Sequence, residues 1–280
     1  MEIKNKQFDE ERALYASSDS LVTNCRFEGP ADGESALKES TNVRVDSSYF
    51  DLRYPFWHDT VLSINSSVLT ANCRAALWYS KEITIRDSVL DGIKALRECE
   101  NITILNSSAN SKEFMWRCKD IHMEDSSVES EYPFFESSNI TLKNFNLKGK
   151  YSFQYAKKVL IEDSNLDTKD AFWHTDNVTV KNTIIKGEYL GWYSNNLTLI
   201  NCTIIGTQPL CYCTNLKLID CKMIDCDFSF EYSTVSANII GSILSVKNPI
   251  SGEIIADKIG EIILDNHQKE GSNCKIITKE

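Results

Sequence analysis

All five tryptophans of the chain have the spacing of a single column of stacked side chains. Each lies nine residues before an Asn, Asp or Ser that recurs along the sequence, which we call the marker. Lys38, Arg97 and Gln154 take the same place in other repeats, so we expect this tryptophan column to face outward. The tryptophan column contains Trp57, Trp78, Trp116, Trp173 and Trp192, with Arg97 and Phe135 at two of the intervening repeats.

The residue after each member of the tryptophan column forms a second, mixed column of aromatic and charged residues. Whether this column points inward or outward stays open, because a bend can fall at this place. Rings can stack on the apolar faces of sugars, and charged groups orient a bound ligand. We therefore predict a binding strip for a carbohydrate or another small or extended polar ligand. Its residues are Trp57, His58, Trp78, Tyr79, Arg97, Glu98, Trp116, Arg117, Phe135, Glu136, Trp173, His174, Trp192 and Tyr193.

Three other interpretations of this strip stay open. The rings can cover the core at a corner of the fold, or the strip can be the interface of a homo-oligomer. Five outward tryptophans of about 150–250 Å² each would exceed the usual apolar patch of about 300–600 Å², so something is expected to cover them. A carbohydrate-active enzyme working through Glu98 or Glu136, about 9.6 Å apart over two repeats, is the third. We assign no catalytic residue.

The cysteines and histidines do not predict a metal site or a cofactor. Cys211, Cys213, Cys221 and Cys226 lie close in sequence, but their spacing differs from that of paired zinc knuckles. We expect small buried side chains stacked in columns. His58 and His174 share a column six repeats apart, too far for one metal ion.

The elements that position these columns follow from a repeat of nineteen residues. Its markers are Asp87, Asn106, Asp125, Asn144, Asp163, Asn182, Asn201 and Asp220. Apolar residues four and two positions before each marker alternate with polar ones, as in a strand with one buried face. Such a period signals a solenoid. We predict an all-β, right-handed parallel β-helix of about twelve rungs, the handedness following the general preference of crossovers.

We expect one domain over residues 1–280, with an N-terminal cap at 1–12, rungs at 13–264 and a tail at 265–280. Insertions are predicted in the loop at 29–34 and around Thr70 to Arg74. A net charge of −10 and a pI near 5.0 argue against nucleic-acid and acidic-membrane partners. Because neither a signal peptide nor a membrane span is visible, we expect a cytoplasmic protein with reduced thiols.

The phrases that surround the two columns resemble one known family. They are GESALKES, LRYPFWH, CRAALWYS, KALREC, SEYPFF, GKYSFQY, TKDAFWHT, GEYLGWYS and GTQPLCYC. They are similar to a bacterial family catalogued as domain of unknown function 3737, from Phe8 to about Asp265. The resemblance implies a single-stranded right-handed β-helix of the pectin-lyase-like class. It implies no activity, substrate or site residue.

Overall fold

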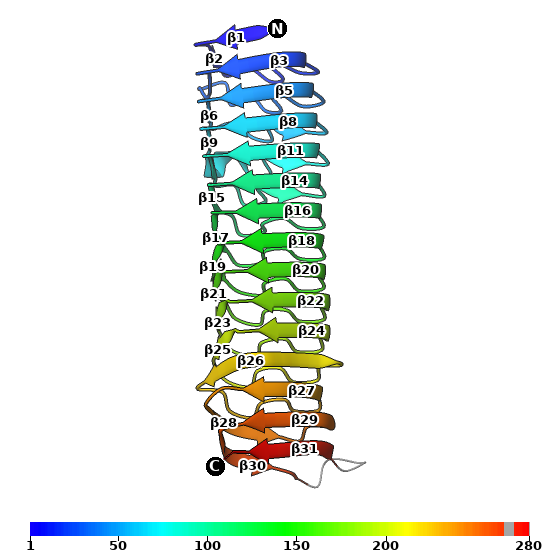
Figure 1. Ribbon diagram of the computed structural model, residues 1–280. Coiled ribbons are helices and arrows are strands. Elements are labelled where there is room, and N and C mark those ends of the chain that lie inside the picture. The colour runs from blue at the N-terminus through cyan, green and yellow to red at the C-terminus, as the bar shows by residue number, and fades with distance from the viewer. Residues whose placement is uncertain (266–271, 280) are drawn as a thin grey trace. The chain divides into compact units, whose positions relative to one another are not determined.

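The computed structural model describes residues 1–265 and 272–279, in two compact units, Met1–Thr141 and Leu142–Glu280. The boundary between the two units lies near Thr141, and the assignment of residues 1–280 to one domain stays a prediction. Each unit is a parallel β-solenoid with a period of about nineteen residues, and the chain makes about fourteen turns. The predicted fold class is confirmed, with right-handed turns and slightly more rungs than expected (Figure 1).

The strands of the first face of unit 1 lie one above another in a parallel sheet (Figure 1). Their register is in step with the repeat, since Ile83 pairs with Leu62 on one side and Ile102 on the other. The strands are β1 Glu2–Lys4, β3 Ser18–Thr23, β5 Thr41–Asp46, β8 Thr60–Asn65, β11 Lys81–Arg86, β14 Glu100–Leu105, β16 Lys119–Glu124 and β18 Ser138–Lys143, within which unit 2 begins.

Two further faces of unit 1 are made by shorter parallel strands. The second face contains β2 Gln7–Phe8, β4 Arg26–Phe27, β6 Tyr49–Phe50, β9 Val68–Leu69, β12 Val89–Leu90, β15 Ser108–Asn110 and β17 Ser127–Ser130. The third contains β7 Phe56–Trp57, β10 Leu77–Trp78 and β13 Leu96–Arg97. The insertion predicted around Thr70 to Arg74 contains a 3-10 turn, η1 Ala71–Cys73, capped by the Thr70 hydroxyl.

Unit 2 repeats this plan. Its long strands are β20 Lys157–Glu162, β22 Asp176–Lys181, β24 Asn195–Ile200, β26 Leu216–Ile224, β27 Thr234–Ile239, β29 Ser251–Ala256 and β31 Asn273–Thr278. Its shorter strands are β19 Asn146–Gly149, β21 Asn165–Asp167, β23 Ile184–Lys186 and β25 Thr203–Ile205. Two further strands of six residues, β28 Ser242–Lys247 and β30 Lys258–Ile263, pair with each other. No helix among the described residues is long and apolar enough to span a membrane.

The core of each unit is a set of inward columns. The apolar residues four and two positions before each marker, such as Ile102 and Ile104 or Val178 and Val180, are buried. All ten cysteines are free thiols, and nine of them are buried, as expected for small interior side chains. Among the described residues, no three His, Cys, Asp or Glu side chains are grouped so that they could hold a metal ion.

The markers are Asn, Asp or Ser because the backbone is left-handed there. Asn106 has a φ of 47°, and Asn182 has a φ of 49°. Asn and Asp tolerate this conformation better than other residues with a side chain. Their side chains also link neighbouring turns, since the Asn182 amide donates to Asp163 and the Asn201 amide donates to Asn182, both at 3.0 Å.

Both ends of the chain contain strands that pair with the neighbouring turns. Residues 1–12 contain β1 and β2, which pair in parallel with β3 and β4 and so form a turn of the same kind. The predicted tail contains β31, which pairs in parallel with β29. Residues 266–271 and 280 of that tail lie outside the described residues.

Candidate functional site

The third face of unit 1 brings the tryptophan column together. Trp78 pairs with Trp57 on one side and with Arg97 on the other, and Arg97 bridges to Trp116. The residues just before them, Phe56, Leu77, Leu96 and Met115, are fully buried. Alternation along the strand therefore directs the tryptophan column outward, as predicted.

The indole rings are nevertheless half-buried, because most of them lie against the following turn. The indole N–H of Trp57 donates to the Ala75 carbonyl at 2.8 Å, and that of Trp116 donates to the Tyr132 carbonyl at 2.7 Å. In unit 2, Trp173 donates to Tyr189 at 2.6 Å and Trp192 to Gln208 at 2.8 Å. These hydrogen bonds fix the rings in place, so the chain's own loops supply part of the cover that is expected over these tryptophans.

The mixed column also faces outward, which the sequence left open. Its backbone is left-handed, with φ of 59° at His58, 57° at Tyr79, 51° at Glu98 and 54° at Arg117. A left-handed residue interrupts the alternation of a strand, so two successive side chains point to solvent. The side chain of Tyr79 is 43% exposed as a result.

Residue types in the mixed column run against this backbone conformation. Left-handed φ costs about 1 kcal/mol or more for residues other than Gly, and Asn and Asp bear it best. The marker column follows that preference, but the mixed column contains no Asn, Asp or Gly. Its members are Ala16, Glu39, His58, Tyr79, Glu98, Arg117, Glu136, Tyr155, His174, Tyr193 and Tyr212.

Rings of the mixed column stack face to face within each unit. In unit 1 the rings of His58 and Tyr79 are 5.0 Å apart. In unit 2 His174 lies between Tyr155 and Tyr193, 4.9 Å from each and within 6° of parallel. Tyr212 continues the stack at 4.8 Å from Tyr193. Because these faces cover one another, the ring edges, hydroxyls and imidazole nitrogens are what solvent reaches. The sequence predicts that sugar rings stack on such faces, whereas here the neighbouring rings of the column occupy them.

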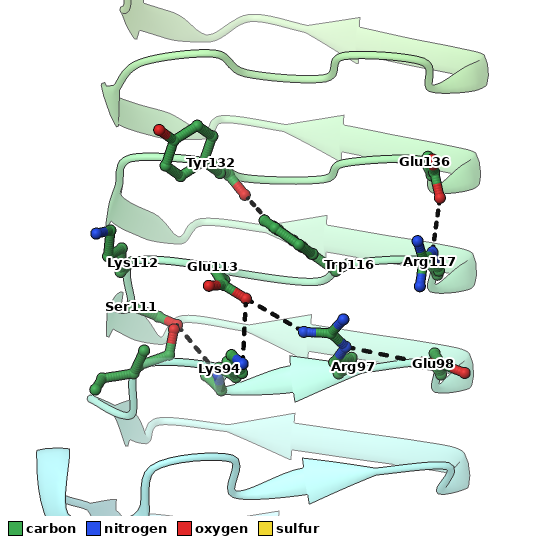
Figure 2. A network of polar contacts seen from close by, with 12 residues as sticks. Lys94, Arg97, Glu98, Ser111, Lys112, Glu113, Trp116, Arg117, Tyr132 and Glu136 are labelled. Atoms are coloured by element: carbon green, nitrogen blue, oxygen red, sulfur yellow. Dashed lines mark hydrogen bonds and ion pairs between the residues drawn. The ribbon is translucent and has the colours of Figure 1, made fainter.

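Arg97 occupies the centre of the strip in unit 1. Its guanidinium lies between two indoles, 5.0 Å from the ring centre of Trp78 and 5.1 Å from that of Trp116. One of its nitrogens donates to a Glu113 carboxylate oxygen at 3.2 Å, and a second is 3.7 Å from Glu98 (Figure 2). Cation–π contacts of this kind are worth about 0.5–2 kcal/mol. Arg97 is therefore held rigidly, with 15% of its side chain exposed.

Arg117 and Glu136 form the next charged pair along the mixed column. The Arg117 Nε donates to a Glu136 oxygen at 2.6 Å (Figure 2). This hydrogen bond raises the pKa of Arg117, so the guanidinium stays charged. Glu98, two turns from Glu136, is paired with Arg97. Both carboxylates that the enzyme hypothesis uses are thus paired with arginine.

Sequence reasoning missed Glu113, which pairs with both Arg97 and Lys94. It is outside the two columns, so the nineteen-residue alignment gave no signal for it. It also left out Tyr155 and Tyr212, although both are members of the mixed column and the periodicity alone could have added them.

Two shallow depressions of unit 1 lie on other columns. One is lined by Asp87, Asn106 and Asp125 together with neighbouring serines, and the other by Glu82, Asn101 and Asp120 together with Thr84, Thr103 and His122. Neither is lined by a residue of the predicted strip. Of the predicted residues, Trp57 to Glu136 belong to unit 1, and Trp173, His174, Trp192 and Tyr193 belong to unit 2.

Comparison with known families finds one match. The family model described as "Protein of unknown function (DUF3737)" matches residues 1–277. No curated protein matches the chain significantly.

Among solved structures, the chain is similar to the surface adhesin PfbA of Streptococcus pneumoniae, at 13% identity and a TM-score of 0.44, over 79% of this chain and 71% of that one. It is similar to the tailspike protein of E. coli bacteriophage HK620 in complex with pentasaccharide, at 8% identity and a TM-score of 0.40, over 98% and 70%. The A-module of the mannuronan C-5 epimerase AlgE4 of Azotobacter vinelandii gives 10% identity and a TM-score of 0.36, over 98% and 89%. At TM-scores below 0.5, we draw nothing about ligand or activity from these likenesses.

Proposed function

We propose a binding function for this chain, which belongs to the DUF3737 family. The ligand is an extended polar molecule, with a carbohydrate chain as the candidate, and it lies along the mixed column of unit 1. The observation that carries the proposal is the presence of large exposed polar side chains on left-handed backbone. Backbone preference alone would place Asn, Asp or Gly there, as it does at the markers. A residue type that is unfavourable for its own backbone conformation is a reason to look for function.

Polar contacts, rather than ring faces, are expected to dominate recognition. The accessible groups of unit 1 are the hydroxyl and ring edge of Tyr79, the Glu98 carboxylate and the Arg117–Glu136 pair. They repeat at the spacing of parallel strands, about 4.8 Å, so an extended ligand can contact several turns at once. Arg97 and its two indoles form a rigid base beside them, which reduces the ordering cost of binding.

A screen with oligosaccharides tests this proposal. The panel contains neutral, uronic-acid and amino-sugar chains of four or more residues, and binding is followed by tryptophan fluorescence. We expect at least one class to bind the wild type and to lose affinity about tenfold or more in Arg117→Ala and Glu98→Ala. Arg86→Ala, which removes an exposed arginine from β11, is the matched control and should bind normally. Failure of every class to bind would contradict the carbohydrate proposal.

The interface of a homo-oligomer would use the same side chains. Sedimentation velocity over a hundredfold concentration range separates the two functions. A concentration-dependent dimer that Arg117→Ala dissociates, together with an empty oligosaccharide screen, would assign the mixed column to self-association.

A further inference from the structure

Among the turns that the structure describes, Asp59 is the only acidic residue in a buried column of small residues, most of which have a hydroxyl or a thiol. This column lies seven residues before the markers, directly after the mixed column, and Asp59 is 1% exposed. Other members of the column in neighbouring turns are Ser40, Ser80, Cys99 and Cys118. A carboxyl group therefore stands where the other turns of this region place a small neutral side chain.

The hydroxyls of this column perform two tasks at once. The Ser137 hydroxyl accepts from the Cys118 N–H at 2.9 Å and donates to the Met115 carbonyl at 2.6 Å. The Ser80 hydroxyl likewise accepts from the Asp59 N–H at 3.0 Å and donates to the Phe56 carbonyl at 3.1 Å. Each hydroxyl thus ties its own turn to the preceding one through one donated and one accepted hydrogen bond.

Asp59 shows the accepting half of this pattern. Its Oδ1 accepts from the Ser40 N–H at 2.8 Å. Its Oδ2 is buried and accepts no hydrogen bond, and no described cation forms an ion pair with it. An ionised carboxylate has no proton to donate, and an uncompensated buried charge is strongly unfavourable. Only the protonated form can reproduce both halves of the pattern.

We propose that Asp59 holds a proton on Oδ2 at neutral pH and donates it in a hydrogen bond to the Leu37 carbonyl. Leu37 stands in the preceding turn where Phe56 stands for Ser80, and it is fully buried. Ionisation removes this hydrogen bond and places a buried charge directly after His58 and two residues after Trp57 in the chain. The rung that begins the binding strip is thereby a pH-sensitive element.

The surroundings of Asp59 favour the neutral form. The pKa of Asp59 is raised to about 8. Burial is the main cause, the hydrogen bond from Ser40 opposes it, and the nearby Cys99 and Glu39 add to the rise. An unfolded aspartate has a pKa of about 3.9. Between these values the folded chain binds one more proton than the unfolded chain. The contribution of Asp59 to the free energy of unfolding is therefore complete below about pH 4. It falls as pH rises toward 8 and is lost above that pH.

Urea unfolding of the full chain from pH 5 to pH 9.5 tests the proposal. In the wild type, the folding equilibrium constant should fall by up to about tenfold per pH unit from 5 to 8, since one proton is released per molecule unfolding. Asp59→Asn should remove this slope, because an amide can accept and donate without ionising. Asp59→Ser, which introduces the side chain that Ser40 and Ser80 have in the neighbouring turns, is the second variant if Asp59→Asn folds poorly.

The ionisation state is read directly from the carbonyl stretch of a protonated carboxyl group in the infrared difference spectrum of wild type and Asp59→Asn. We expect that band at pH 6.5 and its loss near pH 8. A carboxylate at pH 6.5, or an unchanged pH slope in both variants, would overturn the proposal. Any effect on ligand affinity rests on the proposed function, whereas the titration of Asp59 does not, so the two can fail separately.

Discussion

The indole rings of Trp173 and Trp192 lie parallel, with their centres 5.4 Å apart and their planes 5° apart. The nineteen-residue repeat predicts this neighbourhood, and the parallel pairing of β22 with β24 produces it. Each ring covers a face of the other, so the pair contributes to stability as well as to the outer surface of unit 2. Stacked aromatic pairs add about 0.5–1.5 kcal/mol beyond their buried area.

We therefore expect the two tryptophans to be energetically coupled. Trp173→Ala and Trp192→Ala should each lower the free energy of unfolding by about 2–4 kcal/mol, since each removes a half-buried ring and its hydrogen bond. The double variant should be less destabilised than the sum by about 1 kcal/mol. A double-mutant cycle in urea measures this coupling. Simple additivity would show that the stacking contributes nothing of its own.

The inward columns give a prediction about folding. Ile161→Asp in β20 buries an unpaired charge in a fully enclosed position, which costs several kcal/mol and should leave the chain unfolded. Ile184→Asp in β23 is the matched control, because Ile184 is 48% exposed on the outer side of its strand. Circular dichroism and urea unfolding compare the two. Normal folding of Ile161→Asp would contradict the assignment of that column to the core.

Periodicity alone was enough to predict most of the fold. A strand with one buried face shows its alternation directly, so Ile102, Ile104 and their equivalents were placed correctly inside. The direction of the mixed column was not predictable, because the left-handed φ at His58 and Tyr79 has no signature in those residue types. At the markers the same conformation is visible in the sequence, since Asn and Asp are the residues that favour it.

The candidate site was predictable only as a set of neighbours. The repeat placed Arg97 between Trp78 and Trp116 and placed Arg117 beside Glu136. It could not show that the indoles are tied to the following loop, because those hydrogen bonds use backbone carbonyls such as that of Tyr132. It gave no sign of Glu113, which lies outside the two columns.

The central claim is that the side chains of the mixed column serve binding, although their residue types are unfavourable for its left-handed backbone. Arg117→Asn tests this claim most directly. Asn bears the φ of 54° at this position better than Arg, and the ion pair with Glu136 is exposed, so solvent screening keeps its contribution to stability small. The free energy of unfolding should thus stay the same or rise.

Calorimetric titration of wild type, Arg117→Asn and the control Arg86→Asn should use the oligosaccharide that binds best in the screen, with urea unfolding of the same samples. We predict unchanged or higher stability for Arg117→Asn together with an affinity at least tenfold weaker, and normal binding for Arg86→Asn. Loss of more than about 2 kcal/mol of stability with unchanged affinity would contradict the account and make the mixed column structural.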